Sequence, residues 1–324
     1  MNNKMKKEIV IGIDIGGTNT DFGLVDRKGK CYIKKNFQTD TSGSVEAFLD
    51  SLCGDLKKVI SEKKESYSIK GIGIGAPNGN FFTGKIEFAP NLKWKGVIPL
   101  VSLVEDRMQI QAVMTNDANA AAYGEMIYGA AKGMRDFIVI TLGTGLGSGI
   151  VINGEMVYGH DGFAGELGHT VIDPEGRMCG CGKKGCLEAY ASATGIVRTM
   201  IEILGENKEK STLRKIDSIK LTSKDIFYAA KTGDKLALKA FDITGKYLGI
   251  KLADAVSFSS PEAIILLGGL ARAGEYIFNP TKKYMEQYLL PIFRNKVALL
   301  PSKLDKDNAA VLGAAALVWK HIAK

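Results

Sequence analysis

The chain has 324 residues, of which 45% are hydrophobic and 24% charged, and its formal net charge is +8. This length exceeds what one small core usually holds, so we expect two domains. The basic excess is compatible with nucleic-acid or small-anion binding, but the lysines are scattered over amphipathic stretches such as 57–64 and 206–220, where they are mixed with Glu and Asp. We therefore expect a solvated surface and no nucleic-acid partner.

The number and spacing of the cysteines indicate a reducing compartment. Their number, five, is odd, and three of them lie within eight residues of sequence. In a chain of this size, that distribution favours metal binding in a reducing compartment over a set of disulfides.

The N-terminal apolar run is interrupted by Asp14, which is typical of a strand and not of a signal peptide. No apolar run approaches the ~20 residues that a membrane span needs. We expect a cytoplasmic protein with no membrane partner.

The first predicted element is a hairpin. Residues 8–15 are a β-branched run typical of a strand buried on both faces, and residues 22–26 resume it after a glycine turn. Such a turn exposes consecutive backbone N–H groups that can bind phosphate oxygens. Asp14, at the end of the first strand, could hold a metal-bound water. A plain hairpin with a capping Asp is the alternative, and this motif alone does not decide between them.

Helix and strand patterns then alternate. Apolar spacing predicts a helix over 45–60 with Ser44 as its N-cap, and residues 69–75 return to a strand pattern. Asn91 follows in a polar loop, either as a turn residue or as an amide offered to a hydroxylated ligand. A short helix is expected over 99–108.

Asp117 stands where a predicted strand, 111–117, meets a predicted alanine-rich helix, 118–133. One interpretation is an N-cap. The other is a carboxylate at the C-terminal edge of a sheet, where α/β proteins bind their ligands. A helix N-terminus would keep that carboxylate ionised. The segment itself leaves the two interpretations evenly balanced.

Residues 136–153 repeat the pattern of residues 9–25. Ile13 aligns with Ile140 and Gly16 with Gly143, so each half of the chain carries a strand, a glycine turn and a strand. The simplest explanation is a duplicated α/β domain whose two facing glycine turns grip the phosphates of a nucleotide. Two unrelated hairpins are the alternative.

The second half of the chain is mostly helical. Helices are expected over 192–204, 222–231, 234–258 and 309–320, and strands begin near 261 and 295. Gly268 and Gly269 end the first of these strands and could form a wall of a nucleotide pocket close to the adenosine. Because no low-complexity linker is present, we place ordered, hinge-like crossings between the domains near 117–120 and 305–309.

The densest group of candidate ligands lies between Gly165 and Glu188. One imidazole and three thiols supply the ligand set of a closed structural zinc site: His169, Cys179, Cys181 and Cys186. Ordinary unligated thiols are the alternative. Four protein ligands would leave no open position for chemistry on the metal. Glu166 and Glu188 lie beside the cluster, where a metal-stiffened loop would direct them towards a ligand.

Six motifs occur together: DIGGTNT (14–20), NDANAAAYGE (116–125), LGTGLGSGIV (142–151), GELGH (165–169), CGCGKKGCLE (179–188) and LLGG (266–269). Over essentially the whole chain, this combination resembles the ROK family of bacterial sugar kinases and related transcriptional repressors. The resemblance implies an α/β protein with an actin-like ATPase (ribonuclease H-like) fold, in which two α/β domains flank a cleft. We expect a smaller domain of residues 1–117 and 308–324, and a larger domain of residues 118–307 that contains the zinc loop.

The resemblance also implies residue roles. Asp117 would be the general base that takes a proton from a sugar hydroxyl. The sugar-binding positions would be Asn91, Asn116, Asp117, Glu166, His169 and Glu188. The phosphates of ATP would be held by Gly16, Gly17, Thr18, Gly143, Thr144 and Gly145. Asp14 would hold Mg²⁺ through water, and Gly268 and Gly269 would contact the nucleoside. Structural Zn²⁺ would be bound by His169, Cys179, Cys181 and Cys186.

The implied activity is a hexokinase of the glucokinase type, in which ATP phosphorylates a hexose. The two glutamates favour an aldohexose with several equatorial hydroxyls, so the first expectation is conversion of glucose to glucose 6-phosphate. A kinase for fructose or N-acetylmannosamine and a non-catalytic sugar-sensing regulator are the alternatives. Repressor members carry a DNA-binding domain before the first strand, and the eight residues before Ile9 favour an enzyme. Family members are usually homodimers or tetramers.

Two positions depart from the family pattern. Asn19 follows the first glycine turn, where many members carry a basic residue. Residues 75–82 differ from the usual G-x-P-G pattern, with Asn78 and Asn80 in the altered stretch. These departures leave the phosphate contact near Asn19 and the sugar-side contacts open.

Overall fold

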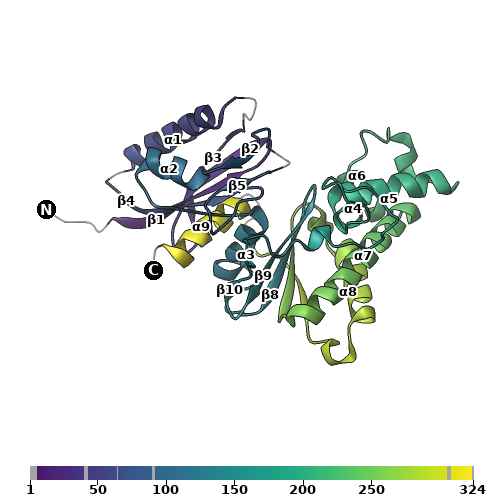
Figure 1. Cartoon of the computed structure of the whole chain (residues 1–324). Coiled ribbons are helices and arrows are strands. Elements are labelled where there is room, and N and C mark those ends of the chain that lie inside the picture. The colour runs from purple at the N-terminus through teal and green to yellow at the C-terminus, as the bar shows by residue number, and fades with distance from the viewer. Residues whose placement is uncertain (1–5, 40–42, 64, 90–91, 305–307, 323–324) are drawn as a thin grey trace. The chain divides into compact units, whose positions relative to one another are not determined.

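The computed structural model describes residues 6–39, 43–63, 65–89, 92–304 and 308–322 (Figure 1). The chain divides into two compact units. The first comprises Met1–Gly133, Met156–Ala164 and Lys303–Lys324, and the second comprises Met134–Glu155 and Gly165–Ser302. Within the described ranges, no helix has the length and apolar character needed to cross a membrane.

The first unit is built on a five-stranded sheet in the order β3-β2-β1-β4-β7. The antiparallel part consists of β1 (Lys7–Ile15), β2 (Asn19–Val25) and β3 (Cys31–Gln38). The parallel part continues from β1 to β4 (Tyr67–Gly75) and β7 (Ala112–Thr115). A small antiparallel pair is formed by β5 (Ile86–Glu87) and β6 (Val97–Ile98).

Helices cover both faces of this sheet (Figure 1). Alternate residues of β1 face opposite sides, as the strand period requires. Ile9, Ile11 and Ile13 pack with α1 (Val45–Glu62) and α2 (Leu100–Met108). Val10 packs on the other side with α9 (Ala309–His321). The expected N-cap of α1 is confirmed, because the Ser44 hydroxyl accepts a hydrogen bond from the Ala47 backbone N–H.

The second unit is built on a sheet in the order β10-β9-β8-β11-β12. Its strands are β8 (Phe137–Leu142), β9 (Leu146–Ile152), β10 (Glu155–Met156), β11 (Ala263–Leu267) and β12 (Ala298–Pro301). Its helices are α4 (Glu188–Ala191), α5 (Ala193–Glu206), α6 (Ser223–Lys231), α7 (Lys235–Ser259) and α8 (Glu275–Tyr288). Its 3₁₀ turns are η1 (Leu167–His169), η2 (Thr212–Lys215), η3 (Leu270–Ala273) and η4 (Pro291–Phe293).

The two sheets repeat one topology. In each, a central strand (β1 or β8) forms a hairpin with the next strand and runs parallel to a later one (β4 or β11). The glycine turns predicted at 16–20 and 143–145 join the strands of the two hairpins. The duplication predicted from the sequence is therefore present in the strand order and directions of both sheets.

The boundary between the units differs from the predicted one at residue 117, since the first unit continues to Gly133. The reason is that α3 (Asp117–Ile127) packs closely on α9. A Cβ built at Gly124 would lie 3.1 Å from the Gly313 Cα, and one built at Gly313 would lie 2.6 Å from the Ala120 carbonyl oxygen. The chain passes between units after Gly133, Glu155, Ala164 and Ser302. Most of the crossing predicted at 305–309 lies outside the described residues.

Gly73→Ala tests how closely α9 approaches the first sheet. A Cβ at Gly73 would overlap the Ala314 carbonyl oxygen of α9, so helix and strand would have to separate. We expect a loss of about 3 kcal/mol or more in the free energy of unfolding, measured by urea denaturation. Gly54→Ala is the control, because a Cβ there meets nothing within 4 Å. It should match or slightly exceed wild-type stability, as Ala is the better helix former. Equal stability of Gly73→Ala and wild type would contradict the packing argument.

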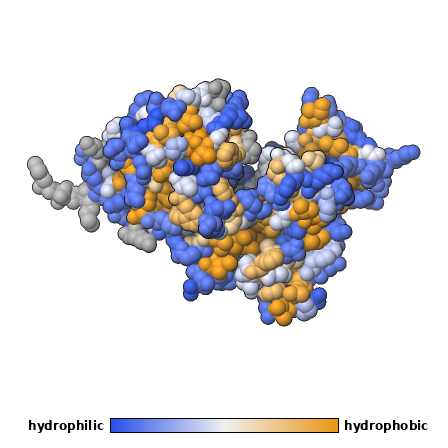
Figure 2. All heavy atoms as spheres, viewed as in Figure 1, coloured by the Kyte–Doolittle hydropathy of each residue, from blue (hydrophilic) through white to orange (hydrophobic). Residues whose placement is uncertain are grey.

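The surface in Figure 2 mixes hydrophilic and apolar residues. The most exposed large apolar side chains are Phe88, Ile219 and Phe258, which are far apart in the sequence. Scattered apolar residues of this kind are normal on a globular surface.

Candidate active site

Two carboxylates lie near the ends of two parallel strands of the first unit that are separated by one strand. Asp14 is the second-last residue of β1, and Asp117 follows β7. Between these strands runs β4, whose last residue, Gly75, is in register with both Asp14 and Thr115. A Cβ built at Gly75 would lie 3.4 Å from Oδ1 of Asp14 and 3.9 Å from the Asp117 Cα. The missing side chain therefore leaves the space between the two acidic residues open.

The pKa values of both carboxyl groups are raised above the ordinary value of an aspartate. Desolvation raises the pKa of Asp14 to about 7, and the charges of Asp117 and Asp21 add to the shift. Desolvation also raises the pKa of Asp117, against the hydrogen bond from the Ala118 backbone N–H at 2.9 Å. Asp117 is exposed to solvent on one side. The desolvation that raises its pKa therefore comes from the protein atoms around it and not from full enclosure of the side chain. Neighbouring carboxylates of this kind attract a hard cation such as Mg²⁺.

The cap of α3 is Asn116, not Asp117. The Asn116 side-chain oxygen accepts a hydrogen bond from the Asn119 backbone N–H at 2.7 Å. The N-cap interpretation of Asp117 is therefore wrong, because Asp117 is already the first helical residue. That position is the positive end of the helix dipole, which favours the ionised carboxylate that a general base needs. The alternative interpretation, a carboxylate at the C-terminal edge of the sheet, fits the observed position.

The first glycine turn connects β1 to β2. The Gly16 backbone N–H donates to the Asn19 carbonyl at 2.9 Å, and Gly17, Thr18 and Asn19 are exposed. The exposed backbone of Gly17 and Thr18 can therefore approach an anion, as the sequence predicts for a phosphate-binding turn. Asn19 begins β2 without adding a charge there.

The second glycine turn, in the second unit, is joined to the cysteine loop through Glu188. One Glu188 oxygen accepts a hydrogen bond from the Leu146 backbone N–H at 2.9 Å, just after the turn. A Cβ at Gly145 would overlap this carboxylate. The Thr194 hydroxyl donates to the Thr144 carbonyl at 2.8 Å. Glu188 thus connects the second glycine turn to the loop of the predicted sugar site.

Gly268 and Gly269 follow β11 in the same unit. Gly268 adopts a φ of +107°, and a Cβ there would lie 2.6 Å from the Leu142 carbonyl oxygen at the end of β8. Only glycine fits both this backbone conformation and this close approach. The glycine pair therefore lies beside the start of the second glycine turn, and Gly269 is exposed.

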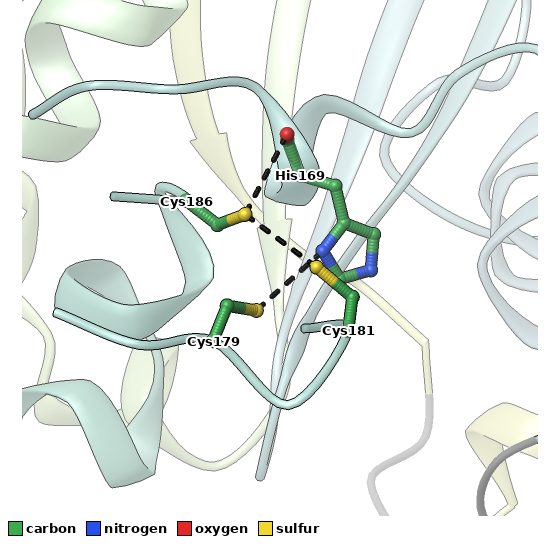
Figure 3. A group of neighbouring side chains, drawn as sticks. All are labelled: His169, Cys179, Cys181 and Cys186. Carbon is green, nitrogen blue, oxygen red and sulfur yellow. Dashed lines mark hydrogen bonds between the residues drawn. The ribbon is translucent and has the colours of Figure 1, made fainter. Parts of the chain in front are cut away.

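The structure gathers the four predicted metal ligands into one group (Figure 3). Their ligand atoms all lie within 4.8 Å of one another. The His169 Nδ1 lies 3.7 Å from the Cys179 Sγ, and the Cys181 and Cys186 sulfurs are 3.6 Å apart. A tetrahedral zinc ion with Zn–S bonds of about 2.3 Å places its sulfurs about 3.8 Å apart. The spacing and the thiol–imidazole chemistry both fit zinc.

The surroundings of the three thiols shift their pKa values in different directions. Burial raises the pKa of Cys179 to about 12 and raises that of Cys186. At Cys181 desolvation is outweighed by the Lys183 backbone N–H and the neighbouring thiols, and the pKa is lowered. Three thiolates this close therefore require a cation, and metal binding would be coupled to loss of the thiol protons.

Glu166 and His169 lie at the two ends of η1. His169 turns Nδ1 towards the thiols, while its Nε2 lies 4.0 Å from a Glu166 carboxylate oxygen. The Ser148 hydroxyl of β9 donates to the Gly165 carbonyl and accepts from the Leu167 N–H, which fixes the loop to the sheet. If Nδ1 binds the metal, Nε2 and Glu166 are directed away from it together.

Arg177 supports the cysteine loop and was not predicted from the sequence. It donates to the Ala189 and Gly195 carbonyls at 2.9 and 3.1 Å, and its guanidinium lies 4.5 Å from the centre of the Tyr190 ring. These bonds hold the loop on α4 and α5. An arginine two residues before a cysteine carries no recognisable signal, because its partners depend on the tertiary fold.

Each unit thus holds part of the predicted set. The first contains Asp14, Gly16, Gly17, Thr18, Asn116 and Asp117. The second contains Gly143, Thr144, Gly145, Glu166, His169, Glu188, Gly268 and Gly269 with the three cysteine ligands. Asn91 lies outside the described residues.

The model of the ROK family matches residues 10–321 of the chain. The chain belongs to the ROK family. A glucokinase from Halalkalibacterium halodurans is 38% identical over 95% of this chain and 94% of its own length. A solved ROK family glucokinase from Streptomyces griseus, in complex with glucose and AMPPNP, is 34% identical with a TM-score of 0.81, covering 96% of this chain and 99% of that one.

ROK proteins of another class are similar as well. A xylose repressor from Bacillus spizizenii is 33% identical over 96% of this chain and 77% of the repressor. The family and its actin-like ATPase fold are therefore shown, as expected from the six motifs. Whether this chain acts as a kinase or as a repressor has to be decided from the chemistry of its candidate site.

Proposed function

We propose that this ROK protein is an ATP-dependent hexokinase that converts glucose to glucose 6-phosphate. The observation that carries the proposal is Asp117, at the N-terminus of α3 and beside Asp14 across Gly75. A sugar-binding regulator has no use for a base beside a second carboxylate, whereas phosphoryl transfer uses both. The two glucokinase relatives named above support glucose as the acceptor.

Phosphoryl transfer depends mainly on positioning and charge stabilisation. Asp117 accepts the proton of the attacking sugar hydroxyl, for which the two oxygens must approach to about 2.6–3.2 Å. The exposed backbone groups of Gly17 and Thr18, with those of Thr144 and Gly145, bind phosphate oxygens. Glu166, His169 Nε2, Glu188 and Asn116 fix the remaining sugar hydroxyls, and Gly268 with Gly269 contacts the nucleoside.

Mg²⁺ bound with ATP would neutralise the β- and γ-phosphates, and Asp14 would hold it through water. Zn²⁺ would be bound by His169 Nδ1 and the three thiolates, with no open position for chemistry. Its role is to stiffen the loop that carries Glu166, His169 and Glu188. The metal is thus proposed as a scaffold for the sugar site.

The raised carboxyl pKa values predict the pH dependence. A protonated Asp117 cannot act as a base, and a protonated Asp14 binds Mg²⁺ weakly. Because desolvation raises both pKa values, kcat/KM should fall as the pH is lowered from about 8 towards 6, well above the ordinary carboxyl pKa of about 4. A pH–rate profile at saturating Mg²⁺ measures this. Constant kcat/KM down to pH 5 would contradict it.

A panel of hexoses with ATP and Mg²⁺, followed by ADP release, tests the proposed function. Glucose should give the highest kcat/KM. If fructose or N-acetylmannosamine were turned over faster, that sugar and not glucose would be the preferred substrate. The similar xylose repressor keeps a regulator as the second candidate, and sugar binding without ADP release from any hexose would favour it.

We also propose a cytoplasmic homo-oligomer, a dimer or tetramer, that does not bind nucleic acid. The support is the family resemblance, together with the cysteines of the described residues, none of which forms a disulfide. Light scattering of the purified protein would give its mass, and a monomer would contradict the oligomer.

A further inference from the structure

One short segment links the two units just before the sugar loop. Met156–Ala164, here termed the crossing segment, groups with the first unit, although Glu155 before it and Gly165 after it belong to the second. Glu166 and His169 follow it after two and five residues. Because the chain between them is short and covalent, whatever holds the crossing segment also sets where the loop of Glu166 and His169 begins.

Asn80 makes a buried polar contact to this segment. Its side chain is 2% exposed, and its amide N–H donates to the Asp161 carbonyl at 2.7 Å. Its amide oxygen accepts from the Phe82 and Thr83 backbone N–H groups at 2.9 and 3.3 Å. Gly162, at a φ of +92°, permits this approach, since a Cβ there would lie 2.6 Å from the Asn80 oxygen. Both ends of one buried amide are therefore used.

The neighbouring aromatic residues hold the same segment. The Phe81 ring stacks on the Tyr158 ring with centroids 4.3 Å apart and planes at 9°. The Tyr158 hydroxyl donates to the Tyr123 hydroxyl at 3.2 Å. Tyr123 belongs to α3, whose first residue is Asp117, and a helix transmits position rigidly over such a distance. The crossing segment is thus bound both to the turn at 78–84 and to the helix of the proposed base.

We propose that Asn80 is a positioning residue for the sugar site, a role that rests on the proposed function. By fixing Asp161, Asn80 holds the crossing segment on the rest of the first unit and so fixes the point from which the chain enters the loop of Glu166 and His169. The altered stretch at 75–82 then has a purpose other than sugar contact. The amide of Asn80 does not touch the sugar; it places the residues that do.

The proposal is tested by comparing two variants of the same turn, Asn80→Asp and its matched control Asn78→Asp. The first change puts an oxygen against the Asp161 carbonyl without changing side-chain size. Asn78 lies in the same turn, and its amide donates to the Glu87 carbonyl at 2.9 Å, away from the crossing segment. We expect Asn80→Asp to raise the glucose KM by at least about tenfold and to leave the ATP KM within about twofold. Asn78→Asp should keep both values near wild type.

Two further readouts separate this role from general damage. Phe81→Leu, which removes the stacking on Tyr158, should raise the glucose KM in the same direction and serves if Asn80→Asp does not fold. Calorimetry without ATP should show weaker glucose binding by both variants. Equal glucose KM values for Asn80→Asp and Asn78→Asp, or equal losses of glucose and ATP affinity, would overturn the inference. Absence of any hexose phosphorylation by the wild type would overturn the proposed function instead, and calorimetry would still test Asn80.

Discussion

Asp117→Asn should lower kcat for glucose by about 10²–10⁴-fold, the usual contribution of a general base. The amide has the same shape as the carboxylate and can still accept the hydrogen bond from the Ala118 backbone N–H, so α3 should keep its structure. It cannot accept the proton of the sugar hydroxyl. Glucose binding measured by calorimetry should therefore stay near the wild-type value while ADP release falls.

Asp21→Asn is the control for this variant. Asp21 pairs with Asp14 across the β1–β2 hairpin, and its charge helps to raise the Asp14 pKa. Its removal changes the local charge by the same amount but removes no base, so kcat should stay within about threefold of wild type. Near-normal turnover by Asp117→Asn would exclude Asp117 as the base.

Cys181→Ser should lose the bound metal and much of the heat stability of the second unit. Cys181 is exposed, so serine leaves no cavity, and the expected effect is loss of one of four ligands. Metal analysis should fall from about one zinc per chain to a small fraction of that. The Tm should fall on the order of 10 °C, which corresponds to several kcal/mol in a unit of this size.

Cys31→Ser is the matched control for the metal. Cys31 lies in the first unit, and its thiol donates to the Ile33 carbonyl at 3.2 Å, a bond that serine can replace. Zinc content and Tm should remain those of wild type. If the native protein contains no zinc, or if Cys181→Ser retains it, the four residues are not a zinc site.

The hairpins and their glycine turns could be predicted because their signals are local. A β-branched run ended by Gly16 or Gly143 indicates a strand and a turn without any knowledge of the rest of the fold. The same holds for the four metal ligands, three of which lie within eight residues. Their convergence needed only sharp glycine turns and the ordinary ligand chemistry of zinc.

What depended on tertiary packing was not predicted. The first unit extends past Asp117 because α3 and α9 meet through Gly124 and Gly313. These two glycines are almost 190 residues apart in the sequence. The helix α8, which contains Pro280, was not predicted. The expected helix over 118–133 ends at Ile127, where the Glu125 carboxylate accepts the Ala130 N–H and turns the chain.

In the candidate site, residue types were predictable but their bonds were not. Asn116 and Asp117 are adjacent, and nothing in their sequence says which of them caps α3. The Glu188 carboxylate binds the Leu146 backbone 42 residues away. The altered stretch with Asn78 and Asn80 left the sugar-side contacts open, and in the structure both amides donate to backbone carbonyls of the first unit.

Phosphorus NMR of the reaction of wild-type protein with glucose, ATP and Mg²⁺ tests the central claim most directly. The account predicts one ADP formed for each glucose 6-phosphate, with the phosphate on O6 and no product from Asp117→Asn. Hydrolysis of ATP to free phosphate, or binding of glucose with ATP left intact, would contradict it.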